Sequence, residues 1–115
     1  MILHCCVLDK FIAPFYDFLE ENFQDCPTRH TFYIAVQNPV YRMPQGNNIY
    51  ISHEHRLARR YAWLIRNMNR AEKIILHGLW DARVLQVLAS QPWLLKKCYW
   101  IIWGGDLYAY QLGER

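Results

Sequence analysis

Two short apolar segments, residues 74–76 and 98–103, limit most strongly what this chain can fold into. The first ends at His77 and Gly78, and the second ends at a Gly-Gly-Asp sequence. Apolar runs this short, separated by a helix-like stretch, are typical of parallel strands that are buried on both faces. In such sheets ligands bind outside the carboxyl ends of the strands. We therefore expect functional residues at these two strand ends.

The rest of the chain alternates between strand and helix patterns. The other predicted strands cover residues 2–8, 31–36 and 49–51, and the predicted helices cover residues 14–23, 54–70 and 81–91. The order β-α-β-β-α-β-α-β predicts an α/β fold, a Rossmann-like three-layer arrangement with an open, mostly parallel sheet. No internal repeat or linker interrupts it, so we expect a single domain over residues 1–115.

Helical spacing also predicts which side of each helix is buried. The first helix is expected to bury Phe15, Phe18, Leu19 and Phe23. The second is expected to bury Leu57, Tyr61, Leu64, Ile65 and Met68, with Ser52 as its N-cap. The third is expected to bury Val84, Leu85 and Leu88, and Pro92 ends it.

Composition and cysteine usage indicate an ordinary folded domain. With 115 residues, 53% of them hydrophobic, the chain can build a core, and a net charge of +3 is too small to indicate nucleic-acid binding. Adjacent Cys5 and Cys6 must point to opposite faces of a strand, and we expect the cysteines to be reduced and packed. The chain has neither a signal-peptide pattern nor a membrane-length apolar run, so we expect the cytosol, with membrane contact only at the surface.

Residues 73–108 resemble the amino-terminal domain of the bacterial 4-acetamido-4,6-dideoxygalactose (Fuc4NAc) transferase family, also called the TDP-Fuc4NAc:lipid II transferase family. That family has a similar apolar-His-Gly strand end. At a matching separation it has a Trp-Gly-(Gly/Ala)-Asp-Leu-Tyr motif, which corresponds here to residues 103–108. Over residues 1–72 the resemblance is looser and consists mainly of the order of strands and helices.

The resemblance implies a glycosyltransferase with two Rossmann-like domains facing across a cleft, the GT-B arrangement. Such an enzyme would move the deoxyamino sugar from a dTDP carrier to an undecaprenyl-pyrophosphate-linked saccharide at the cytoplasmic face of the membrane, in glycan synthesis of the enterobacterial common antigen type. The amino-terminal domain chiefly serves the acceptor, and the carboxyl-terminal domain holds the dTDP-sugar. This chain would supply only the first half, so we expect it to be inactive alone. No cofactor is implied.

Two residues are candidates for catalysis. The imidazole of His77 can exchange protons near neutral pH as a general base or hydrogen-bond an acceptor hydroxyl, although a histidine at a strand end can also simply bond a backbone carbonyl. Asp106 can orient a sugar hydroxyl or cap a following helix. Gly104 and Gly105 can expose backbone amides that bind anionic oxygens, or simply form a turn, and Trp103 beside them can stack on a sugar ring or belong to the core. The resemblance adds Gly78 and Tyr108 as candidate substrate contacts.

Arginines form the strongest basic surface in the chain. Arg56, Arg59, Arg60, Arg66 and Arg70 are expected around Trp63 on the side of the second helix that faces away from the sheet. This surface can lie against anionic lipid headgroups, with Arg56, Arg59, Arg60 and Trp63 in contact, or it can be an ordinary solvated helix face.

Two other kinds of site are disfavoured. His53 and His55 lack a third and fourth ligand at a suitable spacing, so no metal is expected. The first strand is followed by Asp9, Lys10 and Phe11 rather than by a glycine-rich loop, which disfavours dinucleotide binding. An alternative to the transferase function remains, namely a non-catalytic α/β interaction module that forms a homodimer or docks on a partner.

Overall fold

The chain folds as five strands with helices on both sides. A computed structural model describes residues 1–23, 26–36, 40–52, 56–78 and 81–101. The strands are β1 (Ile2–Val7), β2 (His30–Ala35), β3 (Ile49–Ile51), β4 (Lys73–His77) and β5 (Cys98–Ile101). The helices are α1 (Ile12–Asn22), α2 (Cys26–Arg29), α3 (Leu57–Arg70), α4 (Ala82–Ser90) and the 3-10 helix η2 (Pro92–Lys97).

All five strands pair in parallel in one sheet of order β3-β2-β1-β4-β5. This confirms the predicted open, Rossmann-like sheet. β1, the first strand of the chain, is the central strand of the sheet. β2 and β3 are added next to one edge of β1, and the chain then crosses over so that β4 and β5 are added next to the other edge. Right-handed crossovers in these two directions place their helices on opposite faces of the sheet.

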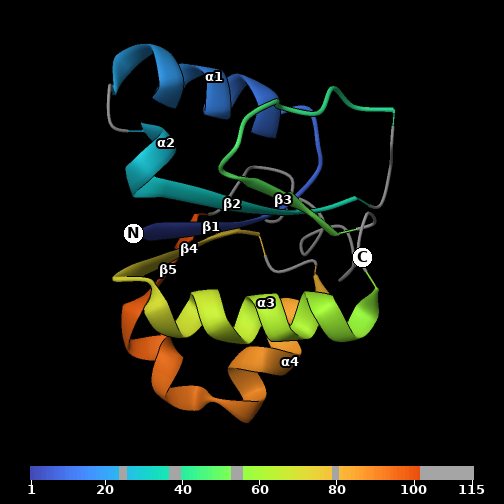
Figure 1. The fold of residues 1–115 in the computed structure, drawn as a ribbon, viewed down its shortest axis with the longest axis vertical. Helices are drawn as coiled ribbons and strands as arrows, with labels where there is room; N and C mark the ends of the chain where they lie inside the picture. The colour runs from blue at the N-terminus through green and yellow to red at the C-terminus, as the bar shows by residue number, and fades with distance from the viewer. Residues whose placement is uncertain (24–25, 37–39, 53–55, 79–80, 102–115) are drawn as a thin grey trace, which may run out of the picture.

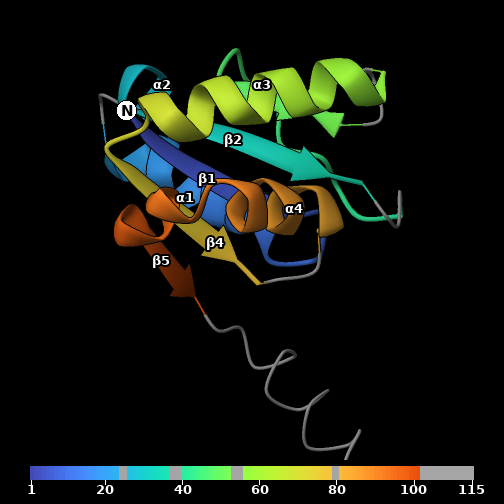
Figure 2. The same ribbon diagram turned by 90° about the horizontal axis from the view of Figure 1, so that it is seen from below.

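Figures 1 and 2 show this three-layer arrangement, with α1 and α2 on one face of the sheet and α3 and α4 on the other. We call these the α1 face and the α3–α4 face. Each face has its own hydrophobic cluster, one around Tyr16 and Phe32 and the other around Leu64 and Ile74. Cys5 and Cys6 belong to different clusters, and both are free thiols, as the sequence predicted.

The predicted buried side of α1 is partly wrong. The helix buries Ile12, Ala13, Tyr16 and Leu19. Phe18 and Phe23 lie outside, more than two fifths exposed, and they contact each other edge to face. The Tyr16 hydroxyl can lie inside because it donates a hydrogen bond to Asn48 Oδ1 at 2.7 Å, which removes the cost of burying it.

The orientation of α3 also differs from the prediction. Leu64 and Met68 are buried as expected, but Leu57 and Ile65 are exposed. Trp63 instead turns toward the sheet, where its ring stacks on Tyr50 at 4.3 Å. Ser52 does not cap this helix, which begins at Leu57, and its hydroxyl accepts a hydrogen bond from Val36 N.

Among the described residues, no helix is both long enough and apolar enough to cross a lipid bilayer.

Candidate functional site at the carboxyl edge of the sheet

β1 and β4 are parallel neighbours in the sheet, and the connections that follow these two strands lead in opposite directions across it. The segment after β1 leads to α1 on one face, and the segment after β4 leads to α4 on the other. In open α/β sheets this topological switch point is where ligands bind, outside the carboxyl ends of the strands. β4 ends at His77, so the His77-Gly78 pair predicted from the sequence lies at this point.

Gly78 has a backbone conformation suited to glycine. Its φ is 82°, in the left-handed region that other residues rarely adopt. This turn redirects the chain as it leaves β4 at the carboxyl edge. Beside it is a hollow of about 10 Å³, room for roughly one water molecule, lined in part by Cys6, Gly78 and Asp81. This hollow is therefore too small for a ligand larger than a water molecule.

Two carboxylates occupy the helix N-termini at the switch point. Asp9 Oδ1 accepts hydrogen bonds from the backbone N–H groups of Phe11 and Ile12, at 2.8 and 3.1 Å, where α1 begins. Asp81 is buried at the N-cap of α4, and its Oδ2 accepts from Val84 N at 3.4 Å. Free amides at a helix N-terminus attract phosphate, but here a carboxylate already fills each position. Neither terminus is arranged to receive the pyrophosphate of a nucleotide.

His77 lies in the interior and is hydrogen-bonded to another histidine. Its side chain is 3% exposed, and its Nε2 is 2.9 Å from Nδ1 of His4 in β1. His4, 1% exposed, uses its other nitrogen, Nε2, to bond Nδ1 of His30 in β2 at 2.8 Å. We call His77, His4 and His30 the histidine chain.

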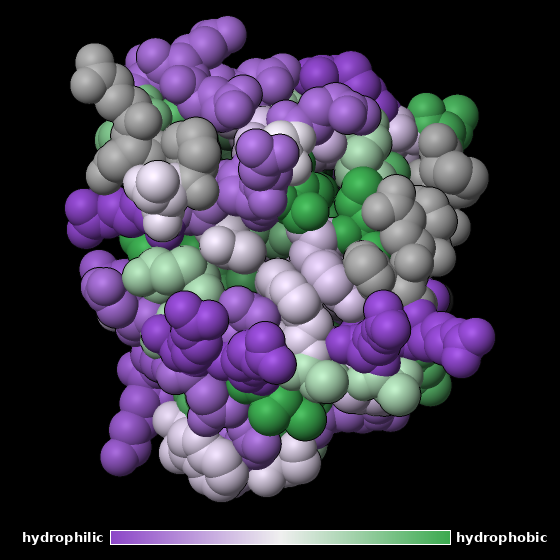
Figure 3. Space-filling model, in the orientation of Figure 1, coloured by the Kyte–Doolittle hydropathy of each residue, from purple (hydrophilic) through white to green (hydrophobic). Residues whose placement is uncertain are grey.

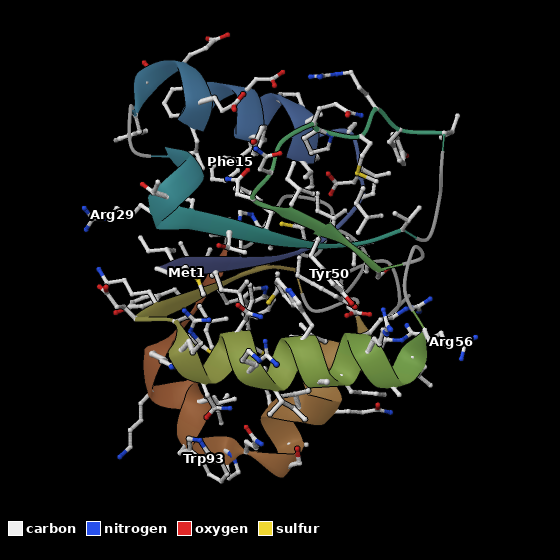
Figure 4. The ribbon with its side chains drawn as sticks, viewed as in Figure 1. Met1, Phe15, Arg29, Tyr50, Arg56 and Trp93 are labelled. Atoms are coloured by element: carbon white, nitrogen blue, oxygen red, sulfur yellow. The ribbon has the colours of Figure 1, made fainter. Side chains whose placement is uncertain are left out.

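Aromatic rings enclose the histidine chain on the α1 face. Phe32 stacks on His4 with ring centroids 4.4 Å apart, and Phe15 meets His4 and His77 edge to face. Figure 4 shows Phe15 between α1 and the sheet. Burial lowers the pKa of His77 to about 4. Burial, and then the charges of His77 and His30, lowers the pKa of His4 to about 3. Both imidazoles are therefore neutral at pH 7.

The arginines predicted to meet a membrane lie at the same edge of the sheet. α3 starts after the carboxyl end of β3, with Arg56 at its N-cap position and no acidic residue in its first turn. Arg56 and Arg59 are exposed, Arg60 is partly buried, and the electrostatic influence of Arg59 and Arg60 reaches Tyr50. In Figure 3 hydrophilic residues gather at this end of α3, and Figure 4 shows Arg56 there, pointing away from the sheet. Trp63 does not belong to this surface, because it packs on Tyr50.

The second predicted motif lies outside the described residues. It includes Asp106 and the candidate contacts Trp103, Gly104, Gly105 and Tyr108. Their proximity to His77 therefore stays a prediction. His53 and His55 are outside as well, and the described parts of the chain contain no group of three or more side chains able to hold a metal ion.

Sequence reasoning missed His4 and His30. The strand pattern carried a usable signal, because His4 alternates with Cys6 on one face of an otherwise apolar strand. A polar side chain at such a position needs a polar partner, and the next strands of the sheet are where it would be found.

Together these features define an open α/β domain with a candidate ligand site at its topological switch point. No model of a known protein family matches the chain, and comparisons with curated proteins and with solved structures found no match either.

Proposed function

We propose that this chain is the acceptor-binding domain of a glycosyltransferase that moves 4-acetamido-4,6-dideoxygalactose from a dTDP-sugar to an undecaprenyl-pyrophosphate-linked saccharide. The observation that carries the proposal is the position of His77 and Gly78 at the switch point of a parallel sheet of order β3-β2-β1-β4-β5. The motif that resembles the transferase family thus lies where such sheets bind ligands.

The charges at this edge support an acceptor site rather than a nucleotide site. Asp9 and Asp81 fill the N-termini of α1 and α4, which disfavours a donor pyrophosphate between them. The first turn of α3 instead combines the positive end of the helix dipole with Arg56, Arg59 and Arg60. We assign these arginines to the lipid-linked pyrophosphate and to anionic headgroups at the cytoplasmic face of the inner membrane.

Burial keeps the His77 imidazole neutral at pH 7, so that it can accept a proton, and we assign it the role of general base. Both of its ring nitrogens are buried. Direct contact with an acceptor hydroxyl therefore requires the carboxyl end of β4 to open. Asp106 remains the proposed partner that orients a sugar hydroxyl, and the dTDP-sugar would bind a separate domain.

Calorimetric titration tests this proposal. A short-chain polyprenyl-pyrophosphate-linked disaccharide should bind the chain, and a dTDP-sugar should not. The Arg59→Ala substitution should weaken acceptor binding about tenfold, because it removes a charge-assisted contact worth roughly 1.5 kcal/mol. Arg70→Ala, at the other end of α3, is the matched control and should leave the affinity unchanged. Binding of the dTDP-sugar in place of the acceptor, or equal losses in both variants, would contradict the proposal.

One observation favours the alternative, an interaction module. An apolar groove of about 380 Å³ lies beside the edge strand β5, lined by Leu85, Leu95 and Trp100 among others. Trp100 is 51% exposed, and large exposed apolar groups of this kind mark interaction surfaces. If the chain forms a dimer through this groove, sedimentation velocity should show a concentration-dependent dimer that Leu95→Glu abolishes. A monomer at every concentration would exclude the homodimer form of this alternative.

A further inference from the structure

The histidine chain crosses the sheet along a diagonal. Ile2 of β1 is in register with His30, and Cys6 of β1 is in register with His77. His4 lies midway between these two positions. Each step along the histidine chain therefore moves to the next strand and two residues closer to the carboxyl edge. The line connects the start of β2, where His30 is partly exposed, with the switch point.

The hydrogen bonds give this line a direction. A neutral imidazole carries one N–H donor and one lone pair, and His4 uses both of its nitrogens within the histidine chain. If His4 donates to His30, it must accept from His77, and if it donates to His77, it must accept from His30. Two arrangements of the histidine chain therefore exist, and each is obtained from the other by moving one proton along each hydrogen bond.

We propose that the histidine chain is a proton relay from the carboxyl end of β4 to the protein surface at the start of β2, with His77 as the receiving end. In the resting arrangement each ring donates toward His30, so that Nδ1 of His77 carries the lone pair. His4 and His30 are positioning residues, since they act through His77. The use of the relay in sugar transfer rests on the proposed function, but the relay itself does not.

In the proposed sugar transfer, one bond exchange is coupled to the passage of one proton through the histidine chain. The acceptor oxygen forms a bond to the anomeric carbon of the dTDP-sugar, and the bond from that carbon to the phosphate oxygen breaks, so that dTDP leaves with the electron pair. The hydroxyl proton goes to Nδ1 of His77, and the proton on Nε2 of His77 moves to Nδ1 of His4. The proton on Nε2 of His4 then moves to Nδ1 of His30, and His30 releases the proton on its Nε2 to water. One proton enters and one leaves, and no imidazole stays charged.

The surroundings of His4 disfavour a protonated ring that persists, so a proton should pass through this residue and not stay on it. Phe15 and Phe32 enclose His4, so a charge held on this ring would be costly. The charges that act on His4 are those of its two partners. Among the described residues, the hydrophobic cluster on this face also contains the titratable groups Cys6 of β1 and Tyr16 of α1, and Arg29 of α2 precedes His30 in the sequence. The Tyr16 hydroxyl donates hydrogen bonds to Asn48 Oδ1 and Glu20 Oε1.

Nuclear magnetic resonance of the chain with ¹⁵N-labelled histidine tests the relay without any activity. When His30 gains a second ring proton, its Nδ1 must donate to His4, and His4 must then donate to Nε2 of His77. As the pH is lowered and His30 gains this proton, the His77 ring should switch from the Nε2–H to the Nδ1–H form. This switch should have the same midpoint as His30. A His77 ring that carries its proton on Nδ1 at high pH, or that never switches, overturns the proposal.

The His30→Gln variant is the matched control. Glutamine does not titrate, and its amide can either accept from or donate to Nε2 of His4, so the tautomer of His77 should not change with pH in this variant. Because His30 is partly exposed, the fold should tolerate this change, and the dispersion of the amide spectrum verifies that it does. A switch of His77 that persists in this variant means that the response does not pass along the histidine chain. If His77 follows His30 but no acceptor binds, the relay stands and the proposed function falls.

Discussion

At the scale of single residues, buried neutral histidines make the stability of the chain depend on pH. The pKa values of His4 and His77 fall to about 3 and about 4 in the folded chain, from 6.5 for an ordinary histidine. The unfolded chain therefore binds more protons between these values, so folding loses stability as the pH falls from about 6.5 to about 3. Above pH 6.5 the contribution is fully present.

Urea unfolding at a series of pH values measures this loss. Each of the two histidines should contribute a slope of up to about 1.4 kcal/mol per pH unit within that window. His77→Asn removes one titrating group but keeps side-chain hydrogen-bonding atoms, so it should reduce the slope by about half. An unchanged slope in this variant would show that His77 is not buried in its neutral form.

Gly46 provides a second prediction at the residue scale. A Cβ atom at this position would overlap the Tyr16 hydroxyl oxygen and lie 2.9 Å from Asn48 Oδ1. It would therefore break the hydrogen bond between Tyr16 and Asn48. Gly46→Ala should therefore cost about 1–3 kcal/mol, because it leaves buried polar atoms unsatisfied. In a Tyr16→Phe background the same substitution should cost less. Equal losses of unfolding free energy in the two backgrounds would contradict this account of Gly46.

At the scale of elements, α4 depends on its N-cap. Asp81 accepts from Val84 N and lies 3.7 Å from Arg83 Nη1, which pairs a buried carboxylate with a guanidinium. Asp81→Ala should destabilise the chain by about 1 kcal/mol in chemical denaturation. Asp81→Asn keeps a capping oxygen and should cost clearly less. If both variants lose the same amount, the carboxylate acts through its charge and not as a cap.

The elements also show what sequence patterns can predict. Every described strand agrees with its prediction to within one or two residues, because short apolar runs bounded by polar residues are typical of buried strands. The helix faces were less predictable. Phe18 lies outside while Tyr16 lies inside, because Asn48, 32 residues away, satisfies the tyrosine hydroxyl. Hydrophobic spacing carries no information about such a partner.

At the scale of the whole molecule, the candidate site is assembled from segments far apart in the sequence. His77 and Gly78 were predictable at a strand end, and the structure confirms that β4 ends there. The sequence signalled that His4 needs a polar partner but did not identify His77, because the two residues are 73 positions apart and meet only through the strand order and the register of β1 with its neighbours. The same strand order creates the switch point between β1 and β4.

The central claim of this account is that a lipid-linked saccharide binds at the carboxyl ends of β1 and β4. A crystal structure of the chain with a short-chain polyprenyl-pyrophosphate-linked disaccharide tests it most directly. We expect the saccharide above His77 and Gly78, with its pyrophosphate on Arg56, Arg59 or Arg60. A saccharide bound at the amino-terminal edge of the sheet, or in the apolar groove beside β5, would contradict the claim.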